Sequence, residues 1–380
     1  MKTQLIAFAA WAALAALPAA LQGQTKVFST GLLNPAKIIL GPPGSLLVSE
    51  FDVTPNSGRV SIVSSSGVRR TLVDGLPSGV GSNGPDGPTG LVLDGNTLYV
   101  AIGDGDELQN TSAADGTQVP NQKAPASPIL DTILQIDFGG SVDKITSAFT
   151  LKAPDHFVLA NGQPVAVDNG SGDKATISML SQFRYRGDPV TIYRNSHPYA
   201  LVKSPEGSNH LYLTDAGLNA LVQVDLPSGR FRVLTSFPNQ PNRGSSGPPT
   251  VEAVPDSIEP FGGKLLVTLL TGFPFSPGDS KVLMVDPATG AASVLLDNLT
   301  NTVAIAWRTG FFGGLSFYVL QFSNDLLNHG PGQLLLVSAG TTKVVVDNLN
   351  GPSAMVLDRP AGRLYITTKA GNLLEYDLPN

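Results

Sequence analysis

Short apolar stretches separated by turns rich in Gly, Pro and Asn recur along most of the chain, and one kind of stretch returns six times. It has the form Leu-Tyr-Val or a close variant and returns about every fifty residues, with one gap of about twice that length. A repeat period in this range is typical of solenoids, propellers and arrays. Its six copies lie at 46–50, 98–102, 211–215, 265–269, 317–321 and 364–368.

Each copy follows a short apolar strand and a tight turn, and each precedes a third strand. In several units a fourth strand follows another glycine-containing turn, as at 67–73 and 229–234. Four short strands per unit are typical of a propeller blade, so we predict an all-β, six-bladed β-propeller. The last unit lacks a fourth strand, and 25–29 has the length and pattern to supply it and close the ring.

The loops of the predicted propeller are unequal in length. Turns between first and second strands are short, whereas second-to-third loops and connections between blades include long ones, notably the expected insertions 106–127 and 152–194. In a propeller these longer loops share one face, which we call the long-loop face, and long ordered loops usually serve function. A seventh, degenerate blade inside the doubled gap is an alternative, although no Leu-Tyr-Val strand can be placed there.

The N-terminus predicts export. Lys2, the apolar run 5–21 and the small residues Ala19, Ala20 and Gly23 at its end are typical of a signal peptide, which we place at 1–23, leaving 24–380 as a single domain. A transmembrane helix is the alternative, but the run is short and no basic stop-transfer follows. We expect a secreted or periplasmic protein that is soluble and monomeric after cleavage, with no membrane attachment.

Composition narrows the classes of function. The chain has no cysteine, which excludes thiolate catalysis, cysteine zinc sites and iron–sulfur clusters. Charged residues make up 14% of the chain and the formal net charge is −6, which does not fit the basic surface of a nucleic-acid binder.

Polar residues are expected to converge where innermost strands begin and second strands end on the long-loop face. Carboxylates with one histidine could hold Ca²⁺ or position water for hydrolysis. Alternatively, these carboxylates cap turns through their own backbone amides. The catalytic candidates are His197, Asp215 and Asp256; the metal candidates are Glu50, Asp104, Asp215 and Asp256; the ligand-binding candidates around the same opening are Tyr199 and Gln321.

The loop 271–278 carries two aromatic rings, Phe273 and Phe275, next to prolines that stiffen it. Rigid aromatics over the channel mouth would favour an apolar or aromatic ligand, or a partner protein. The alternative is that both rings fold onto the fourth blade as a local core.

Four segments carry a resemblance to a known family: Tyr199-Ala200-Leu201, the stretch 211–221, Ala253-Val254-Pro255 and above all Thr271-Gly272-Phe273-Pro274-Phe275. From about Gly31 onward the chain resembles the ScyD/ScyE family, exported bacterial propellers related to NHL-repeat proteins and named from a gene cluster for the pigment scytonemin. The resemblance implies an NHL-like six-bladed propeller that is exported. His197 and Asp256 depart from the residues usual at their positions, and the resemblance implies no catalytic residue.

We therefore expect a binding or scaffolding protein, accessory to the biosynthesis of a secreted, scytonemin-like metabolite, that engages a small apolar or aromatic molecule or a protein on its long-loop face. The alternative is a metal-dependent lactonase or esterase of the gluconolactonase and paraoxonase type, or a lyase of the streptogramin-lyase type. A surface adhesion protein is a third hypothesis. Convergent buried polar groups would favour catalysis, and an open aromatic patch would favour partners.

Overall fold

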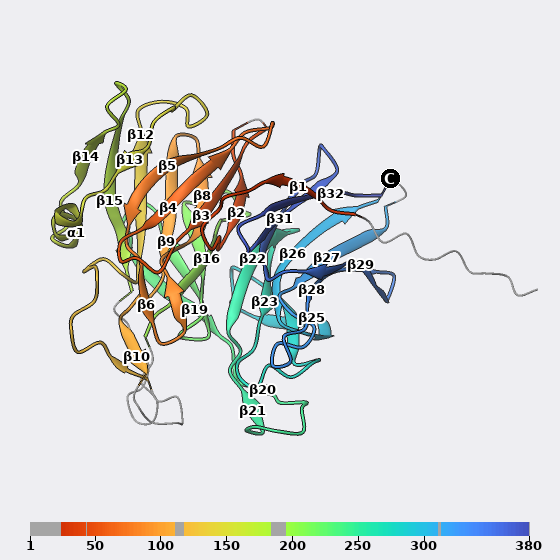
Figure 1. The fold of residues 1–380 in the computed structure, drawn as a ribbon. Coiled ribbons are helices and arrows are strands. Elements are labelled where there is room, and N and C mark those ends of the chain that lie inside the picture. Colours follow the sequence, from red (N-terminus) through yellow and green to blue (C-terminus); the bar gives the residue numbers. More distant parts are fainter. Residues whose placement is uncertain (1–23, 43, 111–117, 184–194, 311–312, 380) are drawn as a thin grey trace, which may run out of the picture.

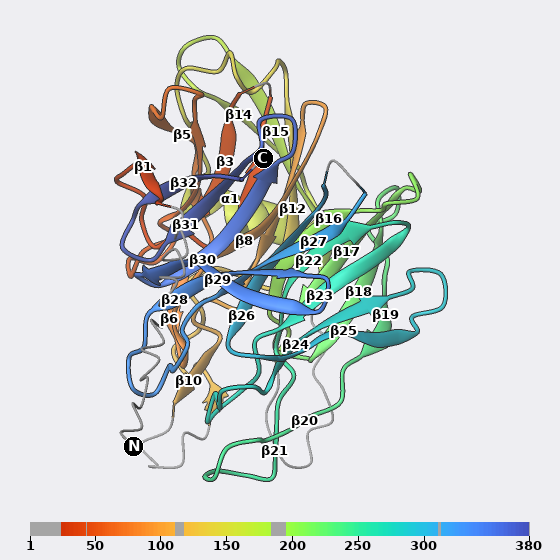
Figure 2. The ribbon, with the colours of Figure 1, turned by 90° about the vertical axis from the view of Figure 1, so that its right-hand side faces the viewer.

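The computed structural model describes residues 24–42, 44–110, 118–183, 195–310 and 313–379. Over these residues the chain forms six antiparallel blade sheets arranged as a ring (Figures 1 and 2). The predicted all-β, six-bladed propeller is therefore confirmed. The predicted signal peptide, 1–23, lies outside the described residues.

The first three blades follow one another along the chain, each running from the centre of the ring to the rim. Blade one consists of β2 (Ile38–Leu40), β3 (Leu46–Glu50), β4 (Gly58–Val63) and β5 (Arg69–Leu76), with β13 (Phe149–Thr150) added parallel to β5. Blade two consists of β8 (Pro88–Asp94), β9 (Thr97–Ile102), β12 (Thr132–Phe138), β15 (Lys174–Gln182) and β14 (Val165–Asp168). Blade three consists of β16 (Pro198–Lys203), β17 (His210–Asp215), β18 (Ala220–Asp225) and β19 (Phe231–Ser236).

The last three blades repeat the four-stranded pattern. Blade four consists of β22 (Pro255–Phe261), β23 (Lys264–Leu269), β24 (Ser280–Val285) and β25 (Ala292–Leu299). Blade five consists of β26 (Thr302–Thr309), β27 (Leu315–Gln321), β28 (Gly332–Ser338) and β29 (Thr341–Leu349). Blade six consists of β30 (Pro352–Asp358), β31 (Arg363–Thr368), β32 (Leu373–Asp377) and the N-terminal strand β1 (Lys26–Ser29).

The N-terminal strand closes the ring, as predicted. β1 pairs antiparallel with β32, with Lys26 opposite Glu375 and Val27 opposite Leu374. The last blade thereby gains its fourth strand from the other end of the chain, and the outer edge of β32 is covered.

The hydrophobic core explains why the Leu-Tyr-Val strands are apolar on both faces. It is divided into six clusters, each packed between two neighbouring blades. A second strand such as β3, buried at all five positions, contributes one side to each of the two flanking clusters. The six first strands contact their neighbours around the ring and line a central channel of about 290 Å³.

Three hairpins extend from the same end of the ring (Figure 1). They are β6 (Gly79–Gly81) with β7 (Gly84–Asp86), β10 (Leu108–Asn110) with β11 (Gln118–Pro120), and β20 (Gln240–Pro241) with β21 (Thr250–Val251). They lie in connections that the sequence assigned to the long-loop face. Part of the expected insertion 106–127 is thus the hairpin β10–β11.

The expected insertion 152–194 needs correction. Its residues Lys174–Gln182 form β15, the fourth strand of blade two, which pairs with β12. The inserted structure lies before that strand and comprises β13, the helix α1 (Ala153–Ala160) and β14. The sequence hid β15 because it lies far beyond β12 along the chain instead of following a tight turn.

The helix α1 has eight residues. Within the described ranges, no helix has the length and apolar character needed to cross a bilayer.

Candidate functional site

A cavity of about 620 Å³ lies on the long-loop face. Five of the six blades contribute to its wall, represented by Phe51, Asp104, His197, Asp256 and Lys369. Each of these residues lies at or beside the start of a first strand or the end of a second strand. The convergence expected from the strand ends is therefore present, and the cavity brings charged groups together from distant parts of the chain.

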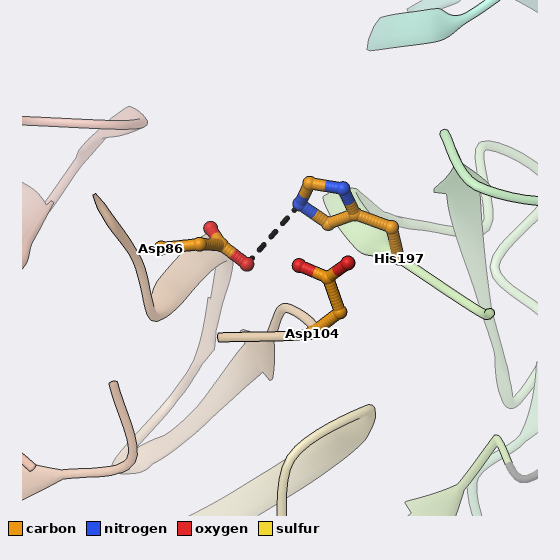
Figure 3. A group of neighbouring side chains, drawn as sticks. All are labelled: Asp86, Asp104 and His197. Atoms are coloured by element: carbon orange, nitrogen blue, oxygen red, sulfur yellow. Dashed lines mark ion pairs between the residues drawn. The ribbon is translucent and has the colours of Figure 1, made fainter. Parts of the chain in front are cut away.

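Asp86, Asp104 and His197 form a compact cluster in this wall (Figure 3). Asp86 ends β7, Asp104 follows β9, and His197 directly precedes β16. One nitrogen or carboxylate oxygen from each residue lies within 4.8 Å of the others. His197 Nε2 is 3.2 Å from Asp86 Oδ2, which is within ion-pair distance, but it makes no hydrogen bond to any described residue.

Glycines fix the position of the Asp86 carboxylate. The backbone N–H of Gly105 donates to Asp86 Oδ2 at 3.2 Å, and Gly105 has a φ of +52°, which glycine adopts without strain. A Cβ on Gly103 would lie 1.9 Å from the same oxygen. The turn after β9 therefore has room for the Asp86 carboxylate because position 103 is a glycine.

Asp215 holds the segment that bears His197. Ser196 Oγ donates to Asp215 Oδ2 at 2.5 Å, and the backbone N–H groups of His197 and Leu218 donate to Oδ1 at 2.9 and 3.0 Å. Both oxygens of this fully buried carboxylate are thus used within the protein. Asp215 has the turn-capping role that the sequence left open as the alternative.

The electrostatics of the cluster favour a cation between its carboxylates. Burial alone would lower the pKa of His197, but the carboxylates of Asp86, Asp104 and Asp215 outweigh it and raise this pKa to about 10. Burial raises the pKa of Asp104 to about 7, although His197 opposes the rise. Burial would also raise the pKa of Asp86, but the charge of His197 lowers it. At neutral pH the cluster therefore retains a proton on His197.

A divalent cation could take the place of that proton. One imidazole nitrogen and two carboxylates are ligands of Zn²⁺ and of Mn²⁺-type ions, and metal binding generally displaces protons from such groups. Three protein ligands beside a cavity leave coordination positions open, as in catalytic metal sites.

A buried ion pair lies nearby. Lys37 Nζ pairs with Asp256 Oδ1, and the two side chains are only 8% and 5% exposed. The same ammonium lies 4.3 Å from the centroid of the Tyr199 ring, which meets the His197 ring edge-on at 5.4 Å. Asp256 is thus neutralised by Lys37.

The loop 271–278 forms an aromatic rim on the cavity. Phe273 and Phe275 both line it, with their ring centroids 6.2 Å apart and nearly perpendicular. Phe273 is 64% exposed, so its ring does not fold into a core on blade four. Thr271 and Phe275 both have positive φ, an uncommon conformation for such side chains.

Three of the residues proposed from sequence are not among those that line the cavity. Glu50 is fully buried and accepts from Arg59 at 2.7 Å and from the backbone N–H of Leu33 at 2.5 Å, so arginine neutralises it and it is not a ligand of the cluster. Asp215 caps its turn, as described above. Gln321 ends β27 and is buried in blade five.

Sequence reasoning missed Asp86, Lys37 and Lys369. Lys37 precedes the first strand of blade one just as His197 precedes that of blade three, and Lys369 follows the second strand of blade six. Comparing equivalent positions in all six repeats, without restricting the search to acids and histidine, would have found both lysines. Asp86 lies in a glycine-rich hairpin that gave no signal beyond a turn.

No family model matches the chain, and no curated protein matches it. Solved structures do resemble it. A gluconolactonase from Xanthomonas campestris shares 12% identity with a TM-score of 0.50, over 95% of this chain and 92% of that one.

Two further structures are similar over most of their length. A Thermus thermophilus protein described as an oxidoreductase (glucose dehydrogenase) shares 13% identity with a TM-score of 0.49, over 93% of this chain and 99% of that one. The Pan2 WD40 domain of Neurospora crassa shares 7% identity with a TM-score of 0.45, over 95% and 97%. At such identities the likeness to the gluconolactonase shows the propeller fold alone, and the two weaker ones add nothing to it.

Proposed function

We propose that the protein is a divalent-cation-dependent hydrolase that cleaves a small ester or lactone in the cavity of the long-loop face. The observation that carries this proposal is the convergence of Asp86, Asp104 and His197, with donor atoms within 4.8 Å, in the wall of a cavity of about 620 Å³. Convergent polar groups in a concave pocket favour catalysis over docking of a flat partner. Hydrolysis was the alternative function expected from the sequence.

The reaction would add water to the acyl carbon and break the acyl C–O bond, giving a carboxylic acid and an alcohol. Asp86, Asp104 and His197 would hold the cation, which would lower the pKa of a water and polarise the carbonyl oxygen. The chain supplies the rest: Asp86 and Asp104 contribute negative charge, and Asp215 orients the segment that carries His197. Tyr199 packs against the His197 ring and limits its movement.

The ligand types suggest which ion would bind. Ca²⁺, the ion expected from the sequence, takes six to eight oxygen ligands. The cluster offers a nitrogen and two carboxylates, which suits Zn²⁺ or Mn²⁺ better. We therefore propose these two ions ahead of Ca²⁺.

A second candidate is the function first expected, an exported binding protein of the ScyD/ScyE type that is accessory to a secreted-metabolite pathway. The observation that favours it is the exposed ring of Phe273 beside that of Phe275 at the cavity rim. An apolar or aromatic ligand could be held there without being cleaved. This second proposal includes membership in the ScyD/ScyE family and export of the protein.

The test is a hydrolysis screen with matched variants. Purified protein is assayed with Zn²⁺, Mn²⁺ or Ca²⁺ on 4-nitrophenyl esters, dihydrocoumarin and gluconolactone, the last because one structural neighbour is named for it. We expect turnover that EDTA abolishes. The double variant Asp86→Asn/Asp104→Asn should lose at least 100-fold in kcat/KM, because both carboxylate ligands lose their charge.

Asp168→Asn is the matched control, because Asp168 is an exposed carboxylate on β14, the outermost strand of blade two. This variant should keep full activity. Turnover that persists in EDTA, or in the double variant, would contradict the cation-dependent mechanism. No turnover with any of the three ions would leave the binding function as the better account.

A further inference from the structure

Lys369 is a cation in the cavity that the proposed chemistry does not use. It directly follows β31 of blade six, and its backbone N–H donates to Gly351 O at 2.8 Å, so the start of its side chain is fixed. Its side chain lines the same cavity as the cluster. In a ring of six blades, blade six lies opposite blade three, which carries His197.

Lys369, which lines the cavity, and Lys37, which lines the adjoining central channel, differ in their partners. Lys37 is paired with Asp256, whereas in the described part of the chain no carboxylate lies within ion-pair distance of Lys369. The contact seen for the Lys369 ammonium is the ring of Phe51, whose centroid lies 5.2 Å away. Burial lowers the pKa of Lys369 to about 8, so the amine is still mostly protonated at neutral pH. An ammonium held in this way gains most from an anion supplied by a ligand.

The charge of the cavity limits that anion. Asp86 and Asp104 also line the wall, so a doubly charged phosphate would meet two carboxylates and, among the described lining residues, a single lysine. Among the described residues that line the cavity there is no arginine and no helix N-terminus, the groups that usually recognise phosphate. A monoanionic carboxylate fits better, with an apolar or aromatic body beside Phe51 and the Phe273–Phe275 rim.

We propose that Lys369 binds the carboxylate of a small monoanionic ligand, whose apolar or aromatic body extends from Lys369 toward the Asp86–Asp104–His197 cluster. This inference rests on the proposed function for its second half: the substrate would be an ester or lactone that carries a free carboxylate. Lys369 would then set the orientation of the substrate and the preference for anions.

Binding of carboxylates and their neutral amides separates this role from a structural one. Phenylacetate, benzoate and hexanoate, each paired with its amide, are titrated into the wild-type protein with and without EDTA, by calorimetry. We expect at least one carboxylate to bind at least ten-fold more tightly than its amide. Lys369→Met should remove that preference, and Lys369→Arg should retain part of it.

Lys203→Met is the control, because Lys203 forms an exposed ion pair with Asp94 away from the cavity. It should keep the full preference for the carboxylate. Thermal unfolding of each variant checks that it is folded.

The proposal is overturned if the wild-type protein binds none of the three carboxylates in preference to its amide, or if Lys369→Met keeps the preference. These results do not decide the hydrolase proposal, which is tested by turnover of esters and lactones. A preference that holds in EDTA and disappears in Lys369→Met supports the lysine even if no ester is cleaved.

Discussion

His197 Nε2 lies 3.2 Å from Asp86 Oδ2, and the two side chains reach this contact from different blades. Asp86 lies just before β8, the first strand of blade two, and His197 just before β16, the first strand of blade three. A shared hydrophobic cluster packs these two blades together. The geometry of the site therefore depends on the packing between the blades as well as on the loops. Changes in those loops can be designed to disturb the cluster without removing one of its side chains.

Gly103→Ala should disrupt the cluster indirectly. The new Cβ would lie 1.9 Å from Asp86 Oδ2, so the carboxylate must move. We expect cation affinity to fall at least ten-fold and the free energy of unfolding to fall by about 1–2 kcal/mol. Metal titration and urea unfolding measure the two effects. Gly140→Ala, where the Cβ meets nothing within 4 Å, is the control, and equal behaviour of the two variants would contradict the prediction.

Asp256→Asn should be costly because it leaves Lys37 without its counter-ion in a buried position. Loss of one partner of a buried pair typically costs about 3–5 kcal/mol, whereas replacing both with apolar residues can be nearly neutral. We therefore expect Asp256→Asn to lose about 3 kcal/mol in urea unfolding, and Lys37→Met/Asp256→Leu to lose much less. A single variant as stable as the wild type would refute the pairing.

Lys369 should make stability depend on pH. Its pKa is lowered by burial and by the charge of Lys37, while Asp86 and Asp256 oppose the shift, from 10.5 to about 8. Between these values the unfolded chain binds a proton that the folded chain does not, so this residue makes the free energy of unfolding rise with pH.

Below pH 8, Lys369→Met should therefore be more stable than the wild type, by roughly 2 kcal/mol after discounting for the solvent that Lys369 still contacts. That advantage should shrink steadily from pH 8 to pH 10.5. Urea unfolding over this range, with Lys203→Met as control, measures the difference. A variant that is less stable at pH 7, or a difference that does not change with pH, would argue against an uncompensated ammonium.

Phe273→Ala should affect binding rather than folding. The ring is 64% exposed at the cavity rim, so the free energy of unfolding should change by no more than about 0.5 kcal/mol. Loss of its contact should weaken binding of phenylacetamide, or raise KM for an aryl ester, by roughly five-fold. Phe157→Ala, at a 62% exposed ring on α1, should change neither quantity. Unchanged binding in Phe273→Ala would remove this loop from the site.

The sequence predicted the fold well because repeated burial leaves a repeated pattern. The second strand of a blade contacts both neighbouring blades, so stretches such as 46–50 and 265–269 are buried throughout, begin with three apolar residues and are easy to recognise. Closure by β1 could be predicted from the missing fourth strand. The position of β15 could not, because the helix and strands inserted before it break the regular spacing.

The candidate site was less predictable because its residues come from different blades and are brought together only when the ring of blades closes. His197, Asp104, Tyr199, Asp256 and the aromatic rim lie at the cavity as expected from strand ends. Whether a carboxylate there faces the cavity or a neighbour depends on side-chain partners. Glu50 ends one second strand and Asp104 follows another, yet Arg59 neutralises Glu50, and the sequence repeat does not show this.

Cation binding tests the central claim most directly. Metal-free protein is titrated calorimetrically with Zn²⁺ and with Mn²⁺, and bound metal is counted per chain after dialysis. We predict one ion per chain in the wild type and in Asp168→Asn, and none in Asp86→Asn/Asp104→Asn, since that variant keeps only His197 of the three donors. A wild-type protein that binds neither ion, or a double variant that still binds one per chain, would contradict the assignment of this cluster.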